Sequence, residues 1–533
     1  MADKSRLSKE QRDALSRGRT GSSNSGLNDV LVPKKKQITA SQPSASDAKQ
    51  REVKSDPPKK EKYDRVIHYD PGTRTVPQQT DADRQTEKNK IPSGKEKTAK
   101  RSGGSQKHTE DNDSLLIRFI QGLRVEPAPY PECQYFKGRG RFDIPLFIVI
   151  LVLAVFGLVM MSSASYAYSL FENRDSYDFM KQQLEGMIIG LILMVIVSFG
   201  DYTMLIMPIK HMLRHLGDVI REFFGKKKKK RNAPKNGKGI NIAHLFFLVS
   251  IVLMAVTCVA GEEVADARRW ITILGVRFQP SEIMKLALII MLAFLIHRFC
   301  VDGKSVKGSF GRYLLVLGMC GALCAFQRHI SAVVIVFVIF VVMMIVGGAS
   351  KKGLFILGGL AAVAFAAVLL FYPSYLTVRF QGWFDPFGDM QNDTYQIGQS
   401  LITIGSGGLF GRGLGNSIQK YYYLPEAQND FVFSILCEEL GFIGGVTVIL
   451  LFVLFAVRGY KVAKGARDQF GAFLALGITV HIVLQAFLNI GVACNAIPNT
   501  GISLPFFSYG RTALIIQLIE MGVLLSVSRS SET

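Results

Sequence analysis

The feature that most constrains this chain is a series of long apolar runs that recur from Ile144 to near the C-terminus. A helix needs about 20 predominantly apolar residues to cross the hydrocarbon core of a bilayer, and runs of this kind keep returning. The pattern excludes a soluble globular enzyme. It also excludes a purely disordered or nucleic-acid-binding chain, although the net charge is +21.

The runs predict about ten spans, with nine as the rival count because the fifth and sixth nearly touch. The predicted spans are Ile144–Met161, Leu184–Phe199, Ile242–Ala260, Ile283–Ile296, Tyr313–Phe326, Ile330–Val346, Leu354–Phe371, Phe431–Val457, Ala472–Ile490 and Phe506–Val527. The expected fold class is therefore an all-α polytopic membrane protein of about ten transmembrane helices, with a large extracytoplasmic loop between spans seven and eight.

Residues 1–141 differ from the rest because they are polar, basic and poor in aromatic side chains. Such a segment buries too little apolar surface to offset the entropy cost of ordering, so we expect a disordered basic cytoplasmic tail. Its charge either holds it near anionic lipids or leaves it a solvated tail with no partner. The membrane domain is predicted to cover residues 142–529, and residues 530–533 form a short cytoplasmic C-terminus.

Lysine and arginine predict the orientation, because both are enriched in cytoplasmic loops. Every second connection is basic, and so is the end of the last span. The basic positions are Lys226–Lys230, Arg231, Arg298, Lys304, Lys307, Lys351, Lys352, Arg458, Lys461, Lys464, Arg467 and Arg529. The sequence therefore predicts a multi-pass membrane protein with both termini in the cytoplasm. The long polar connections Glu262–Pro280 and Tyr372–Asp430 then face outward, and loops of that size are usually functional.

The first outer loop leads into a charged cluster at the start of the fourth span. Glu282 and Lys285 are three residues apart, so they share a helix face and can pair, and Ser281 is positioned to cap that helix. Charges at the edge of a span should face the protein interior. One interpretation is a structural ion pair. The other is a site for an anionic substrate, with Arg268 and Arg269 as phosphate donors.

The second outer segment places two carboxylates, Asp385 and Asp389, among aromatic side chains. Desolvation by aromatic neighbours suits a carboxylate to general-base work, whereas the alternative is ordinary turn chemistry around Asp-Pro and Gly-Asp. Residues 405–415 are dense in glycine but lack the Gly-Lys-Ser/Thr ending of a P-loop, so they predict a tight re-entrant turn. The string 498–506 predicts a kink bracketed by prolines.

Three strings support a more specific interpretation. In order, they read RRWI…G…FQPSEIMKL, YQIGQSLITIGSGGLFGRGLGNSIQKYYYLPEAQNDFVFSILCEELGFIGG and IPNTGISLPFFSYG. Together they resemble the SEDS family (shape, elongation, division and sporulation), the peptidoglycan polymerases FtsW, RodA and SpoVE. The resemblance covers about residues 142–529, and the region around Asp385 together with the Leu-Pro-Glu-Ala string favours the division branch.

The resemblance implies a peptidoglycan glycosyltransferase of the bacterial plasma membrane that polymerises lipid II on the outer face. It implies as partners a class B penicillin-binding protein, which crosslinks the product, and other division or elongation proteins, but no nucleic acid. The family's essential aspartate falls on Asp389, its first-loop tryptophan on Trp270, and its Gln-Pro-Ser-Glu-x-x-Lys on Gln279–Lys285. The expected supporting residues are Gln279, Ser281, Asp385, Gln396, Glu426 and Glu439.

In the implied reaction, the 4-hydroxyl of one lipid-linked disaccharide attacks the anomeric carbon of another and expels a polyprenyl diphosphate. Asp389 is the predicted base, a role worth about 10²–10⁴-fold in rate. The predicted substrate and pyrophosphate contacts are Arg268, Arg269, Trp270, Lys285 and Arg379. A divalent cation, Mg²⁺ or Mn²⁺, is left open as an aid to them, and no organic cofactor is expected.

Two other functions stay open. A lipid II flippase would carry out no bond chemistry; it predicts charges at the bilayer midplane and paired interrupted helices, whereas the sequence has no internal repeat and its key charges lie at the outer ends of spans. A non-catalytic scaffold for division or elongation proteins is suggested by departures from the family pattern. Among these, Met390 replaces a proline after the predicted base, and Thr394 replaces a glycine.

Overall fold

The computed structural model describes residues 140–173, 175–209, 240–264, 267–273, 275–301, 310–371, 373–390 and 394–531. The predicted tail therefore lies outside the described residues except for its last two positions. The same holds for the predicted basic positions Lys226–Lys230, Arg231, Lys304 and Lys307.

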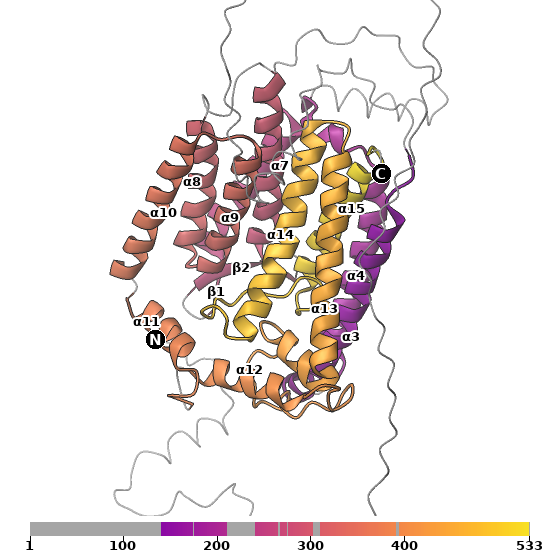
Figure 1. Ribbon diagram of the computed structural model, residues 1–533, viewed down its shortest axis with the longest axis vertical. Helices are drawn as coiled ribbons and strands as arrows, with labels where there is room; N and C mark the ends of the chain where they lie inside the picture. The colour runs from indigo at the N-terminus through magenta and orange to yellow at the C-terminus, as the bar shows by residue number, and fades with distance from the viewer. Residues whose placement is uncertain are drawn as a thin grey trace, which may run out of the picture. The chain divides into compact units, whose positions relative to one another are not determined.

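A helix occupies each of the ten segments predicted to span (Figure 1). These helices are α3 (Ile144–Asn173), α4 (Asp178–Phe199), α6 (Ile242–Ala260), α7 (Pro280–Val301), α8 (Phe310–Phe326), α9 (Ile330–Val346), α10 (Lys351–Phe371), α13 (Val432–Gly465), α14 (Gln469–Ala493) and α15 (Arg511–Ser528). Within the described ranges, six are long and apolar enough to cross a membrane, namely α3, α4, α6, α13, α14 and α15, and α8 and α9 are shorter apolar helices.

The last helix begins later than predicted. The sequence places its start at Phe506, but the structure has a turn there and the helix starts at Arg511. Phe506 has a φ of 67°, in the left-handed region that a right-handed helix does not use. Residues on both sides of it are buried, so the outer turn packs into the protein against α3, where a Cβ on Gly157 would collide with the Phe506 carbonyl.

Helix α14 lies at the centre of the described helices and packs against α7, α9, α13 and α15. Residues 284–297 of α7 are buried almost throughout, as are most of α14 and α15. The outer helices α3, α4 and α6 instead keep one apolar face exposed, with residues such as Ile148, Ile192 and Val252. A helix that is apolar all round belongs in a protein core or a membrane, and both situations occur here.

Two further helices, α11 (Pro373–Phe384) and α12 (Tyr395–Ser406), lie across one end of the bundle, the lower end in Figure 1. A 3₁₀ helix, η2 (Tyr202–Ile206), follows α4. The loop before α7 forms a three-stranded antiparallel sheet of β1 (Glu262–Val264), β2 (Ala267–Ile273) and β3 (Val276–Phe278), in that order. No strand was expected from the sequence, because two of the three have only three residues and show no clear alternation of polar and apolar side chains.

Helix α13 is broken at Gly441, which has φ 69° and ψ −167°. The loop after α12 fills the break, because Arg412 N and Gly413 N donate to the carbonyls of Glu438 and Glu439, and Phe442 N donates to Gly408 O. A Cβ on Gly441 would overlap the backbone of this loop. The predicted tight turn at residues 405–415 is confirmed, and the glycines allow the close approach.

Gly441→Ala should therefore destabilise the protein strongly. Alanine strains the positive φ by about 1–3 kcal/mol and also displaces the loop backbone. The matched control is Gly321→Ala on α8, where a Cβ meets nothing within 4 Å and helix propensity improves by about 1 kcal/mol. Thermal unfolding midpoints in detergent should fall for Gly441→Ala and hold or rise for Gly321→Ala. Equal shifts for both variants would contradict this account.

Candidate active site

Strand β2 separates the two arginines that the sequence analysis grouped together, because neighbouring residues of a strand point to opposite faces. Arg268 faces β1, where its Nη2 lies 3.2 Å from Glu263 Oε2. Trp270, on the same face, lies under the guanidinium of Arg277, 4.9 Å from the ring centroid. Arg269 instead donates from Nη2 to Arg328 O at 2.7 Å, in the turn between α8 and α9.

Arg269 thereby enters a cationic region around His329. Burial, followed by the positive charges of Arg269 and Lys285, lowers the pKa of His329 to about 3. The His329 imidazole is therefore kept neutral, because burial and the two nearby cations both disfavour a positive charge on it. A region with this potential favours an anion, since a nearby negative charge relieves the repulsion between the cations.

The ion pair predicted at the start of α7 is present. Lys285 Nζ lies 2.9 Å from Glu282 Oε1, and the two side chains are 3% and 8% exposed. The predicted cap by Ser281 is wrong, because α7 begins at Pro280 and the Ser281 hydroxyl, inside the first turn, has no hydrogen-bond partner among the described residues. Gln279 precedes the helix, and its carbonyl accepts a bond from Glu282 N.

The loop between α14 and α15 holds both helices that flank the predicted base. Arg379 of α11 donates to Asn499 O, and Asn499 Nδ2 donates to Gln396 Oε1 of α12 at 3.0 Å. Asn495 Nδ2 donates to Trp383 O at 3.0 Å. The turn that contains Asp389 is thus fixed at both ends to one short loop.

Asp389 lies in the turn that connects α11 with the start of α12. Its N–H donates to Thr394 Oγ1 at 3.1 Å, and Thr394 N donates back to Asp389 O at 3.3 Å. On α12, a Cβ at Gly398 would overlap Met390 Sδ, so the turn packs closely on this helix. Asp385 is exposed and its carboxyl folds over Gly388. Thr394 and Met390 therefore help to hold the Asp389 turn.

Asp430 is a carboxylate that the sequence analysis mentioned without assigning it a role. Burial and the negative charge of Glu426 raise its pKa to about 6, and the positive charges of Arg379 and Arg269 oppose the shift. Asp430 therefore lies among groups from α11, β2 and its own loop. Residue spacing does not reveal this cluster, because its members are far apart in the chain.

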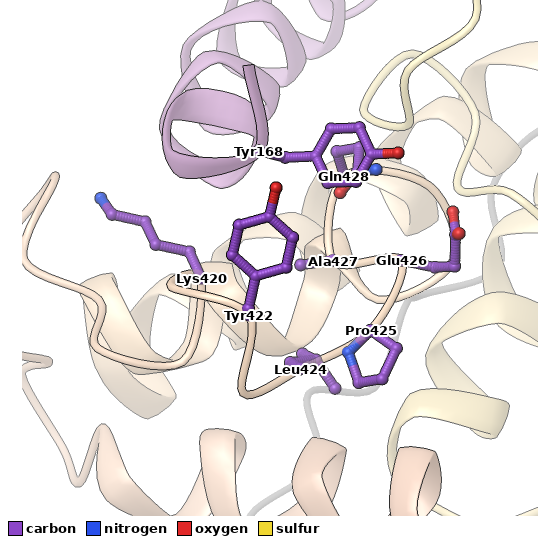
Figure 2. Close-up of a pocket in the computed structure, with 8 residues that line it drawn as sticks. All are labelled: Tyr168, Lys420, Tyr422, Leu424, Pro425, Glu426, Ala427 and Gln428. Atoms are coloured by element: carbon purple, nitrogen blue, oxygen red, sulfur yellow. The ribbon is translucent and has the colours of Figure 1, made fainter. Parts of the chain in front are cut away.

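Glu426 and Glu439 occupy a neighbouring region. A cavity of about 170 Å³ is lined by Tyr168 of α3 and the loop from Lys420 to Gln428. Figure 2 shows the rings of Tyr168 and Tyr422 between Lys420 on one side and Glu426 on the other. The Lys420 ammonium lies 3.2 Å from Glu439 Oε1, and both side chains are buried. Through this ion pair, Glu439 connects the loop from Lys420 to Gln428 with α13. It therefore belongs to a different cluster from Arg269 and Asp430.

The donor set for a divalent cation can also be tested. Within the described part of the chain, no group of three or more His, Cys, Asp or Glu side chains is placed to hold a metal ion. A cation held by substrate phosphates needs only one or two protein carboxylates, so the Mg²⁺ or Mn²⁺ left open by the sequence stays a prediction. The steps proposed below involve side-chain cations only.

These features define a class: a multi-pass membrane protein with a cationic, partly buried site at one end of its helices. Residues 238–533 match the profile of the family described as "Cell cycle protein", which unites FtsW, RodA and SpoVE. This chain belongs to the FtsW/RodA/SpoVE family.

Two named relatives align with this chain over almost their whole length. The chain is 35% identical over 388 residues to the probable peptidoglycan glycosyltransferase FtsW of Geobacter sp. (strain M18), covering 73% of this chain and 96% of the relative. It is also 35% identical over 389 residues to the stage V sporulation protein E of Bacillus subtilis (strain 168), covering 73% and 97%.

One solved structure shows the same fold. It is described as "Structural coordination of polymerization and crosslinking by a peptidoglycan synthase complex", and the TM-score is 0.54 at 23% identity. The match covers 73% of this chain and 98% of that chain.

The raised pKa of Asp430 predicts a pH-dependent stability. An unfolded aspartate has a pKa of about 3.9, so the folded state holds this proton more tightly. The stability that the proton contributes is present below about pH 4 and is lost as the pH rises through about 6. Relative to Asp430→Asn, the wild-type unfolding midpoint should fall across this interval. Parallel curves for the two proteins would contradict the shift.

Proposed function

We propose that this protein is a peptidoglycan glycosyltransferase that polymerises lipid II on the outer face of the bacterial plasma membrane and releases polyprenyl diphosphate. The names of the relatives support the reaction class. The structural observation that carries the proposal is the loop from Asn495 to Asn499. It binds both helices beside the Asp389 turn and brings Arg379 towards Asp430 and Arg269.

In the proposed step, Asp389 accepts the proton of the attacking 4-hydroxyl as the new glycosidic bond forms. The bond from the anomeric carbon to the diphosphate breaks, and the leaving group takes the electron pair and the negative charge. Arg269, Lys285 and Arg379 stabilise that charge, because donors placed in advance act most strongly where charge develops in the transition state. The exposed apolar faces of the helices give the polyprenyl chains a surface inside the bilayer.

The proposed topology has ten spans, with α11, α12 and the β-sheet on the extracytoplasmic side and both termini in the cytoplasm. The basic connections Lys351–Lys352 and Arg458–Arg467 support it, since both lie at the ends of helices opposite to α11 and α12. We propose a class B penicillin-binding protein as the partner that crosslinks the product. The similar solved chain belongs to a complex described as coordinating polymerisation and crosslinking.

The flippase alternative has one observation in its favour. His481 and Glu520 are buried near the middle of α14 and α15, where a flippase is expected to carry titratable side chains at the bilayer midplane. Vesicles discriminate the two functions. A protein that moves labelled lipid II between leaflets but forms no glycan strands would support the flippase, and strands formed without movement would support the polymerase.

Asp389→Asn should abolish polymerisation while the protein remains folded. The amide cannot accept the hydroxyl proton, so the rate should fall by about 10²–10⁴-fold. The comparison is Asp385→Asn, four residues earlier in an exposed position, whose supporting role predicts a clearly smaller loss of activity. The measurement is glycan strand length from lipid II with the full protein and its transpeptidase partner. Normal strands from Asp389→Asn would defeat the assigned role.

Arg269→Ala should slow polymerisation, whereas Arg268→Ala should not. The two arginines are adjacent in sequence, but only Arg269 faces the His329 and Asp430 region, so the pair separates lost charge at the site from lost charge nearby. Removing one well-placed donor should cost at least about tenfold in rate. Initial rates over a range of lipid II concentrations give the comparison. Equal losses of polymerisation rate for both variants would contradict the assignment of Arg269, and not Arg268, to the site.

A further inference from the structure

A row of buried polar side chains continues from Lys285 into the middle of the bundle. Lys285 Nζ donates to Gln485 Oε1 of α14 at 2.9 Å. The same oxygen lies 3.1 Å from His481 Nε2, one turn away on α14. His481 Nδ1 in turn lies 3.0 Å from Glu520 Oε2 on α15. All four side chains are buried, so the contacts form in a medium that screens charge poorly.

The chemistry of the partners fixes the orientation of the Gln485 amide. Its Nε2 donates to the Ser503 carbonyl at 3.1 Å, and a carbonyl can only accept. An ammonium can only donate, so the atom that faces Lys285 must be Oε1. Gln485 Oε1 therefore accepts from Lys285, and the His481 Nε2 that approaches the same oxygen must carry a hydrogen.

This assignment determines the other side of the imidazole ring. With a proton on Nε2, a neutral His481 has a bare Nδ1, which would repel a carboxylate oxygen at 3.0 Å. One further proton must therefore lie in the contact between Nδ1 and Glu520 Oε2, on either atom. Glu520 thus holds the imidazole ring from its Nδ1 side while Nε2 donates to Gln485, and Gln485 directs its carbonyl to Lys285.

We propose that His481 and Glu520 are positioning residues for Lys285. They hold the Gln485 carbonyl against its ammonium, so that Lys285 keeps one direction while it pairs with Glu282 and faces the departing diphosphate. The proposal rests on the function proposed above for Lys285. Two side chains near the middle of α14 and α15, His481 and Glu520, would thereby set the direction of the Lys285 ammonium at the start of α7.

The experiment compares two changes at Glu520 in the full-length protein. Glu520→Gln still offers an N–H to His481 Nδ1, so His481 keeps its proton on Nε2. Glu520→Ala removes that partner, so nothing holds Nδ1 and the ring is free to turn away from Gln485 Oε1. The matched control is Thr479→Val on α14, where the hydroxyl donates to the Ala475 carbonyl of its own helix.

With lipid II and the transpeptidase partner, Glu520→Ala should lower kcat about tenfold with little change in KM, because Lys285 acts mainly on charge that develops in the transition state. Glu520→Gln and Thr479→Val should stay within about twofold of the wild type. Full activity of Glu520→Ala, or equal losses for Glu520→Gln and Glu520→Ala, would overturn the proposal.

A second measurement needs no activity and no Glu520 variant. Nitrogen NMR of the ¹⁵N-histidine-labelled protein in bilayers, with His481→Gln used to assign the signal among the eight histidines, should show a protonated Nε2. A bare Nε2 with the proton on Nδ1 would overturn the inference even if Glu520→Ala fails to fold. A protein that shows the expected spectrum but does not polymerise lipid II would instead count against the proposed function alone.

Discussion

The amide groups on one face of α14 hold one end of this protein together. Gln485 and Asn489 are four residues apart and therefore share that face. Asn489 Nδ2 donates to the carbonyls of Asp430 and Ile502, each at 2.7 Å, while Gln485 binds Lys285 and Ser503. Water does not reach these atoms, so backbone carbonyls that enter the bundle need protein donors. Two side chains of the central helix thus fix the loop after α14, the segment before α13 and the start of α7.

Much of the helical framework was predictable because one physical signal, bilayer-length apolar runs, dominates the sequence. The ion pair between Glu282 and Lys285 was predictable for a similar reason, since it depends on spacing within one helix. The separation of Arg268 from Arg269 was not predicted, because the short strands of the first outer loop were not recognised. Alternation along residues 267–273 was the available signal, although seven residues carry it weakly.

The site itself was only partly predictable. Arg379, Gln396 and Asp389 were identified through a resemblance, but the loop that brings their helices together, from Asn495 to Asn499, was described in the sequence analysis only as part of a kink. His329 and Asp430 owe part of their properties to cations that are distant in the chain, Arg269 and Lys285 for His329 and Arg379 and Arg269 for Asp430, and no local pattern encodes these neighbours. Met390 and Thr394 suggested a non-catalytic scaffold in the sequence, whereas in the structure Thr394 bonds to Asp389 and Met390 packs on Gly398 of α12.

The break in α13 has a consequence for how such proteins can change. The carbonyls freed at Glu438 and Glu439 are satisfied by backbone N–H groups from the glycine-rich loop, and the loop in turn fits only against a residue without a side chain at position 441. The loop and the helix are therefore complementary halves of one backbone ladder. A chimera that inherits either half from a relative with a different loop would strand buried carbonyls, so recombination between such proteins should preserve residues 407–442 as a single exchangeable block.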